Sequence, residues 1–300
     1  MKNILLPFLF LITLCACETM TFEDELGQNP STPQAGKEEK DMKEMCFKCT
    51  GFSMDDISEI SRASSKQEYT DHLLLGIFDN NGNLVGNIMQ HDKNDTTITY
   101  GTFNHVLKYG KYTILAIGWN GDQQCIVQGL DNISFSAGWV PHTFLCRRNI
   151  VVSEAYSDTR TLSMERCVAR FVLKCKDQNL PEETVSFQIR TFNAGNTLDS
   201  ETRHCTHIQE FVRNTGNLGT VTAPLSITSY CFLPEDSASV NINVAAFDKD
   251  GNLLAEKYFA EVPMKINYST NYSGYFFPIG EVEGSVSFNL DFDGDINHEF

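Results

Sequence analysis

The stretch "HLLLGIFDNNGNL", residues 72–84, decides the fold of this chain, because it joins an apolar strand pattern to a tight turn. A second copy, "VAAFDKDGNLLAEK", occupies residues 244–257 and repeats the frame F-D-x-x-G-N-L. Gly82 and Gly251 can adopt a positive φ at no steric cost, and the Asn and Asp residues beside them favour the same turns. Each copy therefore predicts a β-hairpin.

Calcium binding is the alternative explanation for the two repeats. An EF-hand loop needs oxygen ligands at alternating positions, a glycine at the sixth position and a glutamate at the twelfth. In both copies the glycine follows the aspartate too soon, and no series of ligands comes after it. The repeats therefore predict turns, and we expect no metal site there. The tail "DFDGDINHEF", residues 291–300, fits either a calcium-binding string or a strand with an acidic outer face.

The remainder of the chain is dominated by a sequence period of two residues. Short segments rich in β-branched and aromatic residues are bounded by Gly, Asn, Asp or Pro, which is typical of strands and turns. Helical spacing occurs in "DSETRHCTHIQEFV", residues 199–212, where we expect one helix. Many short strands predict an all-β fold of sandwiches rather than alternating βαβ units. The strand segments include "TITYGTFNHVLK", "YTILAIGW", "RFVLKC", "VSFQIRTF", "SITSYCFL" and "SVNINVAAF".

The length of 300 residues favours two domains. The segment "SEAYSDTRTLSMER", residues 153–166, is poor in strand patterns and lies near the middle of the chain. We therefore expect an amino-terminal β-sandwich over residues 45–160 and a carboxy-terminal β-sandwich over residues 161–300. Residues 17–44 are polar and acidic, which predicts a flexible spacer before the first sandwich.

The amino terminus, "MKNILLPFLFLITLCAC", has one lysine and then an apolar run too short to span a bilayer as a mature helix. This predicts a secretory signal peptide over residues 1–16. The run ends in Leu14-Cys15-Ala16-Cys17, which resembles the lipobox of bacterial lipoproteins, whose last cysteine is acylated. Acyl chains such as palmitate on Cys17 would anchor the protein in the outer membrane, since each buried methylene contributes roughly 0.8 kcal/mol. Cleavage by an ordinary signal peptidase is the alternative.

The formal net charge of −16 argues against a nucleic-acid partner, because phosphate binding requires clustered Lys and Arg. The sequence contains no G-x-S-x-G, H-E-x-x-H, P-loop or G-x-G-x-x-G motif. We therefore expect that the protein is not an enzyme and holds no cofactor.

Eight cysteines remain after Cys15 and Cys17 are set aside. An exported protein can oxidise such thiols, but the sequence does not determine their pairing. Two clusters, Cys46-x-x-Cys49 and the segment 204–207 ("HCTH"), contain potential zinc ligands, yet the flanks of the first resemble a strand and no second ligand pair is suitably spaced. We expect no metal site. The eight residues are Cys46, Cys49, Cys125, Cys146, Cys167, Cys175, Cys205 and Cys231.

Four segments carry a family resemblance: "SRASS" (61–65), "VARFVLKCKD" (168–177), "SYCFLP" (229–234) and "YFAEVPMKINYSTNYSGYFF" (258–277). They resemble the fimbrillin-like family of Bacteroidales, the subunits and anchors of type V pili. The resemblance covers roughly residues 45–290. It implies two tandem transthyretin-like Greek-key β-sandwiches in a lipoprotein precursor.

The resemblance also implies an assembly mechanism. In polymerising members, a surface Arg- or Lys-specific protease cuts after the first strand, and the carboxy-terminal strand of a neighbouring subunit fills the groove that remains. Such strand addition takes affinity from ladder hydrogen bonds and register from alternate side chains. The partners implied are other pilus subunits, this protease and the outer membrane.

The corresponding residues can be named in this sequence. The candidate cut lies between Arg62 and Ala63, which would release the strand "EMCFKCTGF", residues 44–52, with Met45, Phe47 and Cys49 on one face. A disulfide from Cys46 or Cys49 to the body would prevent that release. The candidate donor strand lies within residues 284–300, and an ordinary edge strand of the second sandwich is the alternative for it. Its apolar face consists of Val286, Phe288, Leu290 and Phe292.

Two functions therefore remain open. The first is a structural or adhesive pilus component, either a cleaved subunit or an uncleaved anchor, at the cell surface or in the fimbrium. The second is a surface lipoprotein or tip adhesin that binds glycans or other ligands without polymerising. For the second function, Trp119, Trp139 and Tyr100 are candidates for stacking on sugars.

Overall fold

The computed structural model describes residues 41–52, 70–86, 89–92, 99–178, 180–219, 221–277 and 295–299. The predicted signal peptide, Cys17, the Arg62-Ala63 bond and the apolar residues Val286, Phe288, Leu290 and Phe292 lie outside these ranges. The described residues all belong to one compact unit. Within the described ranges, no helix is long and apolar enough to cross a membrane.

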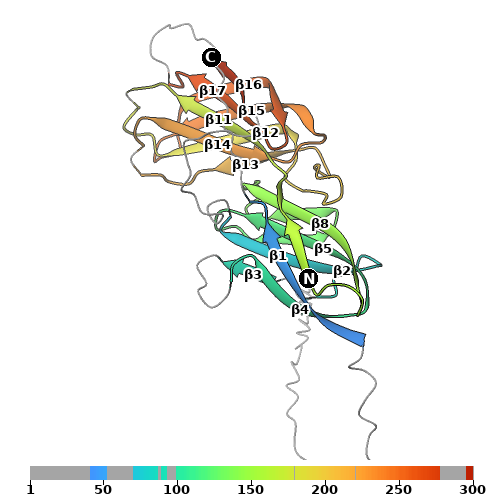
Figure 1. Ribbon diagram of the computed structural model, residues 1–300. Coiled ribbons are helices and arrows are strands. Elements are labelled where there is room, and N and C mark those ends of the chain that lie inside the picture. The colour runs from blue at the N-terminus through green and yellow to red at the C-terminus, as the bar shows by residue number, and fades with distance from the viewer. Residues whose placement is uncertain are drawn as a thin grey trace, which may run out of the picture. The chain divides into compact units, whose positions relative to one another are not determined.

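The described chain is all-β, as the two-residue period predicts (Figure 1). Strands as far as β10 form the sheets of the first half, and strands from β11 onward form those of the second half. The domain boundary near residue 160 and the transthyretin-like Greek-key type remain predictions.

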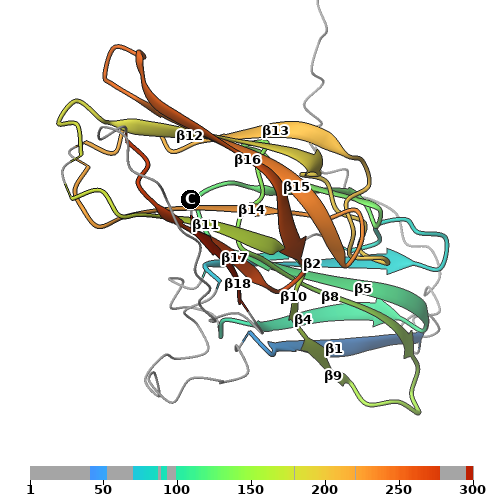
Figure 2. The ribbon, with the colours of Figure 1, turned by 90° about the horizontal axis from the view of Figure 1, so that it is seen from above.

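The first half contains two sheets that pack face to face. One has the strand order β4-β1-β9 and the other the order β10-β8-β5-β2-β3. Figure 2 shows β1, β4 and β9 as one layer against the layer of β2, β5 and β8. Their shared core includes Phe47 of β1, Phe103 of β4, Leu162 of β9 and Ile77 of β2. The strands are β1 (Met42–Thr50), β2 (His72–Asp79), β3 (Met89–Asp92), β4 (Thr102–Lys108), β5 (Gly110–Trp119), β8 (Thr143–Val152), β9 (Thr159–Ser163) and β10 (Glu165–Arg166).

The second half also contains two sheets, with the orders β14-β11-β17-β18 and β13-β12-β15-β16. Phe171 of β11, Ile189 of β12 and Val244 of β15 lie in its core. A separate two-stranded ribbon, β6 (Cys125–Gly129) and β7 (Asn132–Phe135), belongs to the first part of the chain. The strands are β11 (Ala169–Cys175), β12 (Ser186–Ala194), β13 (Gln209–Asn214), β14 (Leu225–Cys231), β15 (Ser237–Phe247), β16 (Leu253–Lys265), β17 (Ser269–Gly274) and β18 (Asp295–Glu299).

Both copies of the repeat form the predicted hairpins. Gly82 and Gly251 have φ values of +82°, which explains why the frame requires glycine at this position. In the first copy the carboxylate of Asp79 accepts hydrogen bonds from the backbone N–H of Asn81 and from the backbone and side chain of Asn83, at 2.8–3.1 Å. Asp248 accepts the equivalent three bonds at 2.8–2.9 Å. The aspartate of the frame therefore holds the turn.

The helix predicted over residues 199–212 is absent, and that prediction is wrong. Asp199 accepts a hydrogen bond from the backbone N–H of Glu201 at 2.7 Å, which forms a local turn instead of a helical ladder. The backbone N–H of Cys205 then donates to the carbonyl of Leu233 at 2.7 Å, and β13 begins shortly afterwards. Short polar side chains and a backbone partner distant in the sequence therefore override the helical spacing.

Candidate functional site

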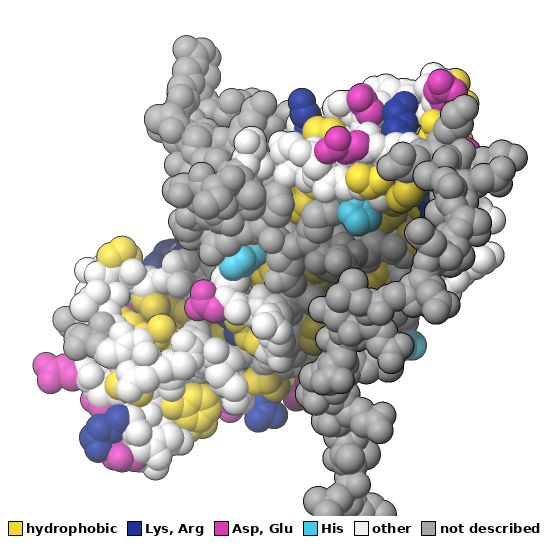
Figure 3. All heavy atoms as spheres, turned by 90° about the horizontal axis from the view of Figure 1, so that it is seen from below, with side chains coloured by type: hydrophobic (Ala, Val, Ile, Leu, Met, Phe, Trp, Pro, Cys, Tyr) yellow, Lys and Arg dark blue, Asp and Glu magenta, His cyan; other side chains and the backbone are white. Residues whose placement is uncertain are grey.

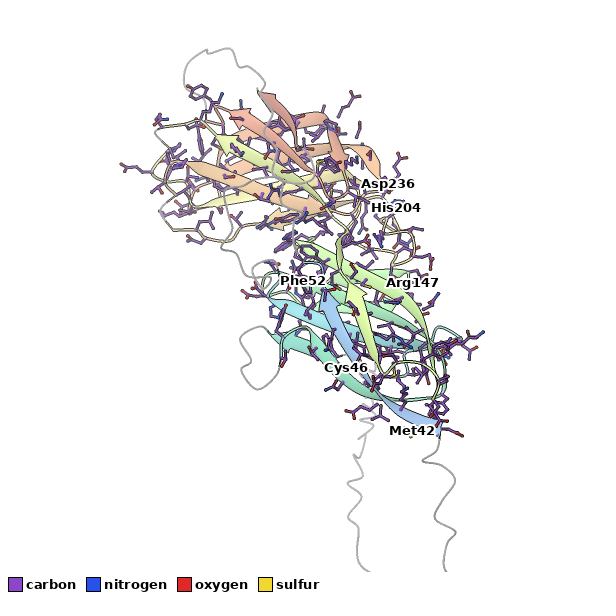
Figure 4. All side chains as sticks on the ribbon, viewed as in Figure 1. Met42, Cys46, Phe52, Arg147, His204 and Asp236 are labelled. Atoms are coloured by element: carbon purple, nitrogen blue, oxygen red, sulfur yellow. The ribbon has the colours of Figure 1, made fainter. Side chains whose placement is uncertain are left out.

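The strand predicted for release, β1, is the central strand of its sheet. It pairs antiparallel with β4 from Met42↔Lys108 to Lys48↔Thr102. On its other side it pairs parallel with β9, from Cys46↔Thr159 to Thr50↔Ser163. In Figure 4, Met42 and Phe52 mark the two ends of this segment. β1 is therefore held by backbone ladders on both edges, although it comes first among the described strands.

The inner face of β1 fills the core of the first half. Met45 and Phe47 have no exposed surface, and Cys49 packs against the same cluster. Full burial of side chains of this size contributes about 1.5–3 kcal/mol each. Apolar burial therefore adds to the backbone ladders in holding β1 to the body, as expected for the alternating pattern in its sequence.

The outer face of β1 is polar and largely exposed. Glu44 and Lys48 are exposed to solvent on that face. At the start of the strand, the ammonium of Lys43 donates a hydrogen bond to the carbonyl of Ser153 at 3.2 Å and another to the carbonyl of Tyr156. These contacts fix the register of β1, because they tie its first residues to the segment between β8 and β9.

The arrangement defines what the body would present without β1. The facing edges of β4 and β9 would lose their ladder partner, and the cavity between them would be lined by Phe103, Leu107 and Leu162. An extended segment with apolar residues at alternate positions could restore both the ladders and the apolar contacts. The site is thus a strand-binding groove that β1 occupies.

The thiols of the described chain are free, including those of Cys46 and Cys49. Burial raises the pKa of the Cys49 thiol to about 12, and the neighbouring Cys146 adds to the shift. Cys49 is therefore uncharged and unreactive at neutral pH. In this structure no disulfide ties β1 to the described body, so its hold on the body is non-covalent.

The two clusters of potential zinc ligands are not assembled into a site. Among the described residues, no three His, Cys, Asp or Glu side chains come together in an arrangement that could hold a metal ion. His204 lies with its Nε2 3.2 Å from the carboxylate of Asp236 instead (Figure 4). On the face seen in Figure 3, described basic and acidic side chains are interspersed.

The aromatic residues considered for sugar stacking are engaged elsewhere. Trp119 is only 2% exposed, and its indole N–H donates to the carbonyl of Gln123 at 2.8 Å, so the expectation for this residue is wrong. The guanidinium of Arg213 covers the ring of Trp139 at 4.7 Å from its centroid. The hydroxyl of Tyr100 lies 2.8 Å from that of Thr70. Aromatic residues on strands serve here as core or as partners of other side chains.

Comparison with protein families identifies the carboxy-terminal part of the chain. Residues 142–300 match the model of a family of unknown function, DUF6562, which is just over half of the chain. The chain belongs to this family. The DUF6562 match begins just before β8 and includes the second half, whereas β1 lies outside it. No curated protein sequence matches the chain.

Solved structures with a similar fold come from the Bacteroidales. A candidate adhesin from Bacteroides ovatus is 11% identical with a TM-score of 0.46, over 74% of this chain and 78% of that one. A candidate adhesin from Bacteroides thetaiotaomicron is 12% identical with a TM-score of 0.43, over 72% and 80%. The fimbrial anchor protein Mfa2 from Porphyromonas gingivalis is 11% identical with a TM-score of 0.37, over 71% and 81%.

Proposed function

We propose that this protein is a structural or adhesive component of a type V-like pilus on the bacterial surface, a fimbrial subunit or its anchor. The observation that carries the proposal is the position of β1. It is paired on both edges, fills the core with Met45 and Phe47, and is held without a disulfide among the described cysteines. The role proposed is binding and assembly, with no catalytic reaction, cofactor or nucleic acid.

Assembly would proceed by exchange of one strand for another. Cleavage of the Arg62-Ala63 bond by a surface Arg-specific protease would separate β1 from the rest of the chain, because the bond lies between β1 and β2 in the sequence. Loss of β1 would open the groove between β4 and β9. The alternating face of Val286, Phe288, Leu290 and Phe292 from a second copy would then fill it.

Anchoring belongs to the same proposal. Lipid on Cys17 would hold the uncut chain in the outer membrane, and cleavage at Arg62 would detach the body from that lipid together with β1. The mass of the protein isolated from cells separates the two roles. A lipidated start at Cys17 identifies an anchor, and a start at Ala63 identifies an assembled subunit.

The polymerisation step is tested on the purified full chain. Limited digestion with an Arg-specific protease should give a body that starts at Ala63 and forms oligomers, detected by mass spectrometry, size-exclusion chromatography and electron microscopy. Deletion of residues 284–300 should abolish the oligomers but not the cut. The variant Arg62→Gln is the matched control, because it keeps every other basic residue yet should remain uncut and monomeric. A body that is cut at Arg62, retains β1 and stays monomeric would contradict the proposal.

A further inference from the structure

Each hairpin repeat borders a cavity on the surface of its own half. The first cavity has a volume of about 460 Å³, and the hairpin residues Asp79, Asn80 and Gly82 form part of its wall. The second has a volume of about 430 Å³ and is bordered in the same way by Asp248 and Gly251. Both volumes lie within the range of small-molecule sites, roughly 300–1,000 Å³. The two cavities differ in the polar groups that they offer to a ligand.

The floor of the first cavity is formed by neighbouring residues of β5 and β8. Thr113 lies opposite Asn149 in the ladder, Lys111 lies two pairs further along on the same face, and Leu115, two pairs away in the other direction, is opposite Arg147. Because Lys111 and Leu115 are four positions apart, the two cationic side chains start roughly 13 Å from each other along the strands. The floor is thus an elongated row of polar groups with a cation at each end.

Hydrogen-bond donors are available on this floor. Lys111 is exposed, and its ammonium has no acceptor among the described residues. The side-chain oxygen of Asn149 accepts a hydrogen bond from Thr113 at 2.8 Å, which leaves the amide N–H groups of Asn149 without a described acceptor. The guanidinium of Arg147 is held by Glu201 at 2.6 Å and by Ser200 at 3.3 Å (Figure 4). Arg147 is therefore fixed in place, while Lys111 and Asn149 can bind.

The acceptors of the first cavity are already used. The carboxylate of Asp79 accepts the three N–H groups of its own turn, and the side-chain oxygen of Asn149 accepts the hydroxyl of Thr113. Glu201 neutralises Arg147, and the turn surrounds Asp79, so the ammonium of Lys111 is the lining charge that can pair with a ligand. A matching ligand therefore supplies negative charge and hydrogen-bond acceptors.

The second cavity lacks a free ammonium among its described lining residues. The ammonium of Lys249 pairs with the carboxylate of Asp250 at 2.9 Å. The side-chain amide of Gln188 donates to the side-chain oxygen of Asn214 at 3.1 Å. Its charged lining residues, Asp248 and Lys249, sum to zero. The same turn therefore borders one cavity whose lysine has no described partner and one whose lysine is paired with a carboxylate.

We propose that the cavity beside the first hairpin binds an acidic saccharide, with the ligand carboxylate on Lys111 and ligand hydroxyls on Asn149 and Thr113. A sugar acid supplies a charged acceptor and several hydroxyl oxygens within a short length, which matches the row of donors. An extended peptide gains no ladder hydrogen bonds from β5, because β2 and β8 already pair with both of its edges.

This inference does not rest on strand exchange. The cavity is built on the sheet of β5 and β8, whereas β1 belongs to the other sheet of the first half. Saccharide binding is therefore expected in the uncut chain. Failure of polymerisation leaves it intact, and failure of saccharide binding leaves the strand exchange intact.

The test is calorimetric titration of the uncut full chain with a galacturonic acid oligomer and with its neutral methyl ester. Binding should be detected for the acid, weaken as ionic strength rises and be at least about tenfold weaker for the ester. Lys111→Gln should weaken binding about tenfold, because it removes the positive charge that pairs with the ligand carboxylate. Asn149→Asp should also weaken binding about tenfold, because it places a negative charge beside the acidic ligand. Lys111→Arg should preserve it.

The second cavity supplies the matched control. Lys249→Gln and Asn214→Asp make the same chemical changes beside the second hairpin and should leave binding unchanged, with circular dichroism confirming that every variant is folded. The proposal is overturned if the acid does not bind at millimolar concentration, or if the ester or a short glutamate peptide binds equally well. It is also overturned if Lys249→Gln weakens binding as much as Lys111→Gln.

Discussion

β1 and β11 occupy the same position in the two halves of the molecule. β1 pairs antiparallel with β4 and parallel with β9, and β11 pairs antiparallel with β14 and parallel with β17. Each buries a phenylalanine completely, Phe47 in β1 and Phe171 in β11. Figure 1 shows both as inner strands of their sheets. The first strand of each half is therefore buried in the same way, between one antiparallel and one parallel neighbour.

The difference between the two strands lies in the chain around them. The sequence between β1 and β2 contains Arg62, so a single cut there separates β1 from everything that follows. β11 follows directly on β10, and the buried carboxylate of Asp177 just after it accepts the backbone N–H groups of Phe276 and Phe277 at 2.8 and 3.2 Å. Under the proposed cleavage, similar packing would give a removable strand in one half and a permanent one in the other.

The largest effects are expected from emptying the two equivalent core positions. Phe47→Ala and Phe171→Ala should each lower the free energy of unfolding by about 3–5 kcal/mol, measured by chemical denaturation, because each leaves a cavity in a closed core. In the chain cut at Arg62, Phe47→Ala should also accelerate dissociation of β1, which mass spectrometry of the separated species detects. Phe171→Ala should leave that rate unchanged. Equal dissociation rates for both variants would contradict the comparison.

A half-buried thiol in β1 and a buried thiol in β11 distinguish the two strands by their chemical protection. Burial raises the pKa of both Cys49 in β1 and Cys175 in β11 to about 12, from an ordinary value of 9.0. The thiolate fraction of each at neutral pH is therefore roughly a thousandfold below that of an exposed cysteine. Alkylation followed by peptide mass spectrometry should find both protected in the uncut chain.

Release of β1 should expose one thiol and not the other. After cleavage and loss of the strand, Cys49 should react at the rate of an exposed thiol, whereas Cys175 should remain protected in the body. Cys46, which is already half-buried rather than enclosed, provides the internal reference on the same strand. Reactivity of Cys175 on the same time scale would mean that the whole body unfolds, and β1 would then not be a separable element.

Local patterns in the sequence predict the strands and turns well. The frame F-D-x-x-G-N-L specifies a turn through the glycine and the aspartate alone, and the alternation of Met45 and Phe47 specifies the buried face of β1. The helix predicted over residues 199–212 does not form because the backbone N–H of Cys205 bonds to the distant carbonyl of Leu233, a contact that helical spacing does not reveal. Propensity decides an element only where no distant segment competes for its hydrogen bonds.

The candidate sites depend on register, which the sequence alone does not determine. Thr113 and Asn149 are neighbours because β5 and β8 pair in one particular alignment. The spacing of Lys111 and Thr113 on one strand is evident from the sequence, but nothing near them indicates that Asn149 lies opposite Thr113 or that Arg147 lies opposite Leu115. The same limit explains Trp119, whose aromatic ring suggests sugar stacking but whose strand position places it in the core. The repeated sequence frame predicts the turns, whereas the residues that lie beside each turn are known only from the strand pairing in the structure.

A smaller effect is expected from Asp177, which anchors the second half after β11. Asp177→Asn keeps one side-chain acceptor but presents an amide N–H₂ to the other backbone N–H, so one buried donor loses its partner. We expect the free energy of unfolding to fall by about 1–3 kcal/mol. Release of β1 from the chain cut at Arg62 should be unaffected, measured as for Phe171→Ala. Faster release of β1 would show that the two halves do not act separately.

The smallest effects should come from the hairpin aspartates, which contribute alike to both halves. Hydrogen bonds from the turn, chiefly those of Asn83 and Asn252, hold the pKa of Asp79 and of Asp248 below the ordinary value of 3.8. A carboxyl whose pKa is lower in the folded state than in the unfolded state stabilises the fold at pH values above its unfolded pKa. This contribution is lost as the pH falls through its folded pKa.

Thermal denaturation between about pH 6 and about pH 2 should therefore show a loss of stability below about pH 4, part of which disappears in Asp79→Asn and an equal part in Asp248→Asn. Equal contributions are expected because the three hydrogen bonds to each carboxylate are the same. A larger loss from Asp79→Asn would mean that the first hairpin also supports the cavity or the core beneath it. Equal losses would leave β1, rather than the turns, as the feature that separates the two halves.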